Sequence, residues 1–236
     1  MSSKFWSFIL KKTLQIGAIF IAIIFAGCSN NVIVKEVDIY FNDFESNDFT
    51  GISGVYISEF NGSKVMGNFN NKGFQLRLEN IPEHNYIQVS FDLYIHDSWD
   101  GNTNELNPQG KDHDAWIMEF DLNENLKATE KIYFETTFSN GLCIPGYCYS
   151  QSYPHSFPFP NEARQDATSV QLPGHCIWET NPTGTSLYKI TKIFPHSRLN
   201  SIIHFYDRLI QTDTFDPLCD ESWSLDNLKI KVLTID

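Results

Sequence analysis

Basic residues are scarce in this sequence of 236 residues, which has 17 Lys and Arg against 29 Asp and Glu. The formal net charge at pH 7 is −12. A chain of this sign is repelled by phosphate backbones and by anionic lipid surfaces, whereas it attracts divalent cations. The composition therefore excludes nucleic acid as a partner.

The common sequence motifs of enzymes are also absent. The chain has no G-x-S-x-G elbow, no P-loop and no H-E-x-x-H pattern. Its seven histidines are scattered, and an isolated histidine is more often structural than a metal ligand. No segment long enough to trust has the period of a helix, and no internal repeat is present, so an all-helical fold and a solenoid are excluded.

One long apolar run is present, near the start of the chain. Lys4, Lys11 and Lys12 precede or flank the run Ile16–Phe25, which leads into Ala26, Gly27 and Cys28. A basic segment, an apolar segment too short for a comfortable membrane span and small residues before a cleavage point predict a signal peptide over 1–27. Its removal takes three lysines and no acid, which changes the formal charge from −12 to −15.

The small residues before Cys28 resemble the lipobox of bacterial lipoproteins. The resemblance implies a diacylglycerol on the Cys28 sulfur and a further acyl chain, such as palmitate, on its nitrogen. More than one acyl chain gives stable anchoring, so we expect a protein held on a membrane of the bacterial envelope, either in the outer membrane or at the cell surface. Ordinary secretion, with Cys28 merely near the cleavage point, is the alternative.

Four further cysteines, an even number, follow in a chain that leaves the reducing cytoplasm: Cys143, Cys148, Cys176 and Cys219. Three pairings are possible. The turn sequence between Cys143 and Cys148 favours a bond between these two, which leaves Cys176 to pair with Cys219. Reduced buried thiols and a zinc site are the alternatives, and the lack of C-x-x-C spacing makes zinc the weaker one.

Strand patterns dominate the rest of the chain, because apolar and polar residues alternate in many short runs separated by Gly, Asn, Pro and Asp. We expect strands at Val37–Phe41, Gly54–Glu59, Phe74–Leu78, Ile87–Ile95, Ala115–Asp121, Lys131–Phe138, Leu187–Phe194, Ser201–Tyr206 and Leu228–Ile235. Around nine strands without alternating helices predict an all-β fold, an antiparallel two-sheet β-sandwich or jelly roll. The expected organisation is a tether over 28–37 and one domain over 38–236.

Several sequence blocks occur in one order along the domain. They are Ser90–Gly101, Asp114–Trp116, Thr136–Asn140, Gln151–Pro154, Phe194–Ser197 and Asp220–Asn227. The series resembles an extracellular jelly-roll module of the broad concanavalin-like or galactose-binding-like type. The resemblance implies binding or adhesion and no established catalytic activity.

The resemblance also suggests a calcium ion. In carbohydrate-binding jelly rolls an acidic residue near the first strand and one in the last strand commonly share an ion, because those strands are neighbours. Asp43, Glu45 and Asp226 occupy matching positions here, and calcium takes six to eight oxygen ligands of this kind. We expect Glu45 and Asp226 first, then Asp43, to hold calcium; the alternative is that they are ordinary turn and capping residues.

A second acidic group lies in the irregular region 97–114. Asp97 and Asp100 flank Trp99, and Asp112 and Asp114 precede Trp116. The group is predicted either to bind an ion or to place Trp99 and Trp116 where a sugar ring stacks on them. The alternative is an Asx-rich loop with both tryptophans in the core.

One acidic pattern favours an enzyme. Glu119, Asp121 and Glu124 have the E-x-D-x-x-E spacing, which resembles that of retaining β-glucanases, whose two carboxylates stand about 5 Å apart. Such patterns arise readily in an acidic chain, so we expect a non-catalytic module that binds a glycan or a surface protein. A retaining glycoside hydrolase and a structural envelope component are the alternatives.

The anchor gives a direct prediction. Cys28→Ala removes the sulfur that would carry the lipid, so the variant should move from the membrane fraction to the soluble fraction. Full retention of the variant in the membrane fraction would contradict lipidation at Cys28.

Overall fold

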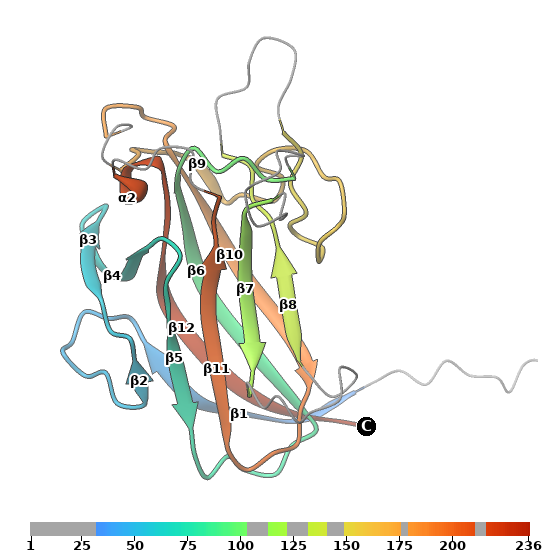
Figure 1. Ribbon diagram of the computed structural model, residues 1–236. Helices are drawn as coiled ribbons and strands as arrows, with labels where there is room; N and C mark the ends of the chain where they lie inside the picture. Colours follow the sequence, from blue (N-terminus) through green and yellow to red (C-terminus); the bar gives the residue numbers. More distant parts are fainter. Residues whose placement is uncertain (1–31, 103–112, 122–131, 141–148, 176–178, 211–215) are drawn as a thin grey trace, which may run out of the picture.

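The computed structural model describes residues 32–102, 113–121, 132–140, 149–175, 179–210 and 216–236 (Figure 1). Two antiparallel sheets pack face to face, so the predicted β-sandwich is confirmed. Within these ranges no helix has the length and apolar character needed to cross a bilayer.

The first sheet has seven strands in the order β3-β4-β12-β6-β10-β9, with β1 also paired to β12. Its strands are β1 (Ile33–Asn42), β3 (Ile57–Phe60), β4 (Ser63–Phe69), β6 (Tyr86–Asp97), β9 (Ser169–Leu172), β10 (Thr185–Pro195) and β12 (Glu221–Ile235). The second sheet has five strands in the order β2-β5-β11-β7-β8. They are β2 (Ile52–Ser53), β5 (Gly73–Leu78), β7 (Ala115–Phe120), β8 (Tyr133–Thr136) and β11 (Ser201–Arg208).

The core lies between the two sheets and is rich in aromatic rings. The alternation in β5 and β6 places every second side chain inside, as the sequence pattern predicts. Phe205 in β11 stacks on Phe74 with ring centres 4.8 Å apart, and Trp116 meets Trp223 edge to face at 5.9 Å. These rings join the two sheets, because Trp223 comes from β12 and Trp116 from β7.

Strand β12 changes neighbour at a bulge. Its first part pairs with β4 and its second part with β1, while β6 pairs with it on the other side throughout. The register shifts between Asp226 and Lys229, where Asn227 has a positive φ of 54°. The extra residue keeps Leu225 and Leu228 both on the core side, since without it every later side chain would point to the opposite face.

The structure differs from the sequence prediction in four places. Strand β4 was not expected, because both of its faces are covered and its residues do not alternate. Strand β9 lies between the expected strands Lys131–Phe138 and Leu187–Phe194, where no strand was predicted. The tether expected over 28–37 is shorter, because Ile33–Val37 pair with β12 as part of β1. The last strand begins at Glu221 rather than Leu228 and follows a one-turn helix, α2 (Pro217–Asp220).

The aromatic core gives a stability prediction. Phe205 is fully buried, so Phe205→Ala should lower the free energy of unfolding by about 3–5 kcal/mol through lost burial and the cavity left behind. Leu199→Ala is the control, because Leu199 is 65% exposed and its removal should change stability little. Equal denaturation midpoints for the two variants would contradict this account of the core.

Candidate functional site

The outward side of the five-stranded sheet carries an unusual number of polar and ionisable side chains. Because side chains alternate along a strand, the residues that face away from the core share one surface. We call this surface the polar face and define it by Gln75, Glu119, Tyr133, Glu135, His204, Tyr206 and Arg208. It is the leading candidate for a binding site.

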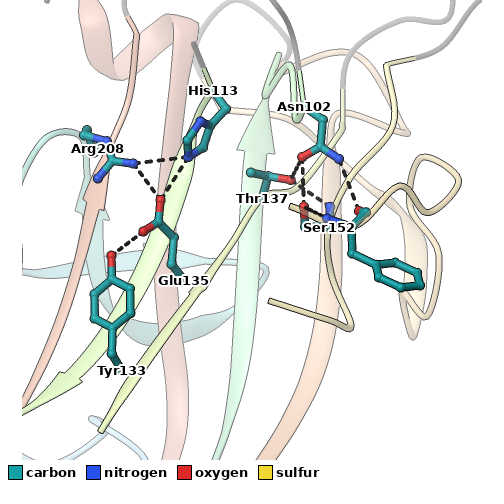
Figure 2. Close-up of polar contacts among 8 residues, drawn as sticks. Asn102, His113, Tyr133, Glu135, Thr137, Ser152 and Arg208 are labelled. Atoms are coloured by element: carbon teal, nitrogen blue, oxygen red, sulfur yellow. Dashed lines mark hydrogen bonds and ion pairs between the residues drawn. The ribbon is translucent and has the colours of Figure 1, made fainter. Parts of the chain in front are cut away.

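Glu135 is the centre of a polar network on this face, together with His113 at the edge of the sheet (Figure 2). Its Oε1 accepts a hydrogen bond from Arg208 at 2.6 Å and one from His113 Nε2 at 2.9 Å. Its Oε2 accepts the hydroxyl of Tyr133. A second pair lies on β7 and β11, where the Tyr206 hydroxyl donates to Glu119 Oε2 at 2.9 Å.

These contacts fix the protonation states of the network. Burial would raise the pKa of Glu135, but the hydrogen bonds from His113, Tyr133 and Arg208 outweigh it and lower that pKa to about 2. Burial and the neighbouring carboxylates raise the pKa of Tyr133 and of Tyr206. At neutral pH Glu135 is therefore an acceptor, and both tyrosines are hydroxyl donors.

A hollow of about 500 Å³ adjoins these residues on the β2 side of the face. Gln75, His204 and Tyr206 line it together with Lys72 and Ser53. Burial lowers the pKa of His204, so its imidazole is neutral at pH 7. The hollow thus combines amide, hydroxyl and imidazole groups within the usual size range of small-molecule sites, roughly 300–1,000 Å³.

The loop that begins at residue 149 contacts the β8 side of the polar face. Asn102 Oδ1 accepts the hydroxyls of Thr137 at 2.6 Å and Ser152 at 2.9 Å, which ties the loop to the strand end (Figure 2). Phe157, farther along this loop, stacks on His113 with ring centres 3.7 Å apart. The loop therefore holds His113 in place beside Glu135.

An acidic cluster lies at the end of the sandwich where β12 begins. Carboxylate oxygens of Asp100, Asp114 and Glu221 lie within 4.8 Å of one another, and such a group could hold a metal ion. Burial, followed by the charges of Asp114, Asp100 and Asp220, raises the pKa of Glu221 well above its ordinary value. Asp100 and Asp114 were predicted from the region 97–114, and Glu221 joins them because β12 starts earlier than expected.

The expectation that Trp99 and Trp116 stack on a sugar is corrected by their burial. Both side chains are 0% exposed. Trp99 Nε1 donates to the Ser222 carbonyl at 2.9 Å, and Trp116 packs against Phe91 and Trp223. Asp97 is also enclosed, and its Oδ1 accepts the backbone N–H of His175. These side chains belong to the interior rather than to a sugar-binding surface.

The predicted calcium residues Glu45 and Asp226 lie on either side of one hydroxyl. Ser63 Oγ is 2.7 Å from Glu45 Oε1 and 3.3 Å from Asp226 Oδ2. Burial, with added repulsion from Asp92 and Glu45, raises the pKa of Asp226 to about 6. Asp43 lies nearby in sequence, and its Oδ1 accepts the Glu45 N–H. Carboxylates and a hydroxyl are suitable oxygen donors for calcium.

Of the E-x-D-x-x-E residues, the structure describes Glu119 and Asp121, and the carboxylate of each has its own hydrogen-bond partners. Asp121 has a positive φ of 47°, and its carboxylate accepts hydrogen bonds from Arg198 and the Ile202 N–H. Glu119 is bound to Tyr206, and Glu124 lies outside the described residues. Asp112, Cys28, Cys143, Cys148 and Cys176 also lie outside them, so lipidation and the cysteine pairing stay predictions; Cys219 is in α2.

Four residues of the polar face were not predicted as site residues: Tyr133, Glu135, Tyr206 and Arg208. Each occupies an outward position in a strand that the sequence largely predicts. The alternation of side chains along these strands places the four residues on the outward face. An outward polar side chain is ordinarily only solvated, so the alternation alone does not mark a site. Only the register between β7, β8 and β11 shows that they meet.

Comparisons with known proteins give little beyond this geometry. The sequence matches no described protein family and no curated protein. Among solved structures, it is similar to the native structure of a family 35 carbohydrate binding module from Clostridium thermocellum, with 12% identity over 83% of this chain and 97% of that chain and a TM-score of 0.28. A TM-score of this size does not establish a shared fold or ligand.

The enclosed Asp97 gives a pH prediction. Burial, with the charge of Asp220 adding to it, raises its pKa from 3.8 to about 7. Between these values the native carboxyl keeps a proton that the unfolded one has lost. The free energy of unfolding of wild type should therefore fall as pH rises toward 7, whereas that of Asp97→Asn lacks this decrease. The difference between the two should change by at most about 1.4 kcal/mol per pH unit.

Urea unfolding between pH 5 and 8 measures this difference. Asp97→Asn keeps the oxygen that accepts the His175 N–H, so its pH profile should be flatter than that of wild type. The control is Glu83→Gln, at an exposed residue; its stability should depend on pH in the same way as that of wild type. An Asp97→Asn profile parallel to that of wild type would contradict the raised pKa.

Proposed function

We propose that this protein is a lipid-anchored, extracytoplasmic module that binds a glycan without converting it. The observation that carries the proposal is the polar face, where Tyr206, His204 and Gln75 adjoin an open hollow. Sugars are recognised by directed hydrogen bonds to their hydroxyls and by aromatic faces against their apolar C–H surfaces. The polar face offers both kinds of group.

The charge states favour binding over hydrolysis at this face. A glycosidase acid must carry a proton near neutral pH, and enzymes raise the pKa of a carboxyl for that purpose. Glu135 has a pKa lowered to about 2, so it cannot serve as this acid. The tyrosines keep their protons and donate hydrogen bonds to Glu135 and Glu119, so their hydroxyl oxygens can accept hydrogen bonds from sugar hydroxyls but do not act as bases.

A glycan screen tests the proposal. The full-length protein in detergent micelles should bind at least one glycan on an array and release no reducing sugar from it. Tyr206→Phe removes one hydroxyl and should weaken binding roughly fivefold, as expected from about 1 kcal/mol for one hydrogen bond. The matched control is Tyr86→Phe, on the other sheet, which should bind like wild type.

Three results would point elsewhere. Binding to no glycan would remove the proposal and leave a structural envelope role. Release of reducing sugar that Glu119→Gln abolishes would favour the glycosidase. Loss of binding in Tyr86→Phe, but not in Tyr206→Phe, would move the site to the other sheet.

Calcium is proposed as a stabilising ion held by Glu45, Asp226 and Asp43. The motivating geometry is the pair of carboxylates on either side of Ser63 Oγ. A bound cation would relieve the repulsion that contributes to the raised pKa of Asp226. A ligand that binds only the folded state adds about 2.7 kcal/mol at a hundred times its dissociation constant.

Thermal unfolding with calcium or a chelator should show this stabilisation. Calcium up to millimolar concentration should raise the melting temperature of wild type, and Asp226→Asn should remove most of the increase. Asp100→Asn is the matched control at the other acidic cluster. An increase that persists in Asp226→Asn but disappears in Asp100→Asn would assign the ion to Asp100, Asp114 and Glu221, and no increase in wild type would remove calcium altogether.

The expected bonds between Cys143 and Cys148 and between Cys176 and Cys219 belong to the same proposal, because an exported protein matures in an oxidising compartment.

A further inference from the structure

A second hollow lies next to the one on the polar face. Its volume is about 810 Å³, and it is lined by Val55, Tyr56 and Phe69 on one side and by Pro217 and Leu218 of α2 on the other. Figure 1 shows β4, β5 and α2, which contribute residues to its lining, on the left of the sandwich. The catalytic and calcium hypotheses above leave it without a role.

The two hollows are adjacent. Both are lined by Gly54, Lys72 and Gly73, so these three residues lie where the hollows meet. A Cβ at Gly73 would lie 2.0 Å from the Phe205 carbonyl oxygen, and one at Gly54 would lie 2.8 Å from the Gly73 carbonyl oxygen. Gly54 also has a positive φ of 78°, which favours glycine. Close packing of the backbone thus requires glycine at two of the three shared residues.

The walls of the second hollow differ from those of the first. Tyr56 is 52% exposed and Val55 is 41% exposed, which makes an apolar surface beside the core ring of Phe69. The Tyr56 and Phe69 ring centres are 6.4 Å apart, and the Tyr56 carbonyl accepts the Gly67 N–H at 2.8 Å. These contacts hold an exposed aromatic ring in place, the kind of surface on which a sugar ring packs.

We propose that the ligand is an extended chain of a neutral polysaccharide, with one part on the polar face and another against Tyr56. This inference rests on the glycan binding proposed above and deepens it. Each hollow is large enough for a small-molecule site, so a ligand that fills both needs a unit in each and one across the residues that they share. The chain's net charge of −12 disfavours a polyanionic glycan, which leaves the neutral class.

Calorimetry on the full-length protein in detergent micelles tests the chain length. The probes are oligosaccharides of two to six sugars from cellulose, laminarin, xylan and mannan. In at least one series the affinity should rise by about fivefold to tenfold between the disaccharide and the longer members, as one further aromatic contact would give. Tyr56→Ala should remove this increment and leave disaccharide binding unchanged.

Two further variants complete the design. Tyr206→Phe should weaken binding at every length, because it alters the first hollow. Phe41→Ala removes an aromatic residue that is 60% exposed on β1, outside both hollows, and should have no effect.

The outcomes separate the two proposals. Equal affinity for disaccharides and hexasaccharides, or an increment that survives Tyr56→Ala, would overturn the extended site and leave glycan binding intact. Binding of uronate-containing chains in preference to all four neutral series would overturn the neutral class. Failure to bind any glycan would overturn the glycan proposal and this inference together. A protein partner whose binding Tyr56→Ala abolishes, without any length effect, would assign the second hollow to that partner.

Discussion

The pairing of β12 with β6 is the interaction on which the rest of the structure depends. It runs from Glu221 opposite Asp97 to Leu233 opposite Tyr86, through the middle of the larger sheet. The bulge at Asp226 and Asn227 lets one strand keep its apolar side chains inside while it changes neighbour from β4 to β1. The acidic cluster at one end of β12 and the predicted calcium residues at the bulge both take their positions from it.

The polar face shows how a sheet can hold an ordered set of polar side chains without a cleft cut into the core. Its inward side chains are aromatic and closely packed, which fixes the backbone and therefore the spacing of the outward groups. Glu135 is then held by donors from two strands and one loop. Such a surface is already organised before a ligand arrives, which reduces the ordering cost of binding.

The sequence predicts the fold well and the site only in part. Alternation located β5 and β6 because one face of each is buried, but it failed for β4, where both faces are covered. The neighbourhood of Glu45 and Asp226 followed from chain order, since the first and last strands pair. The meeting of Tyr133, Glu135 and Arg208 could not be predicted, because it depends on the register between strands that are far apart in the chain. The same limit explains why the sequence left two interpretations open for Trp99 and Trp116, a sugar-binding surface and the core.

The antiparallel pairing of β1 with β12 also decides which end of the sandwich lies where the chain enters the domain. The chain enters the domain at Ile33, opposite Ile235, whereas α2 and the second hollow lie at the other end of β12 (Figure 1). At about 3.3 Å per residue, the 15 residues of β12 separate these ends by on the order of 45 Å. The predicted lipid on Cys28, five residues before Ile33, would place this base of the domain close to a bilayer and the hollow beside α2 far from it, within reach of long polymers outside the membrane.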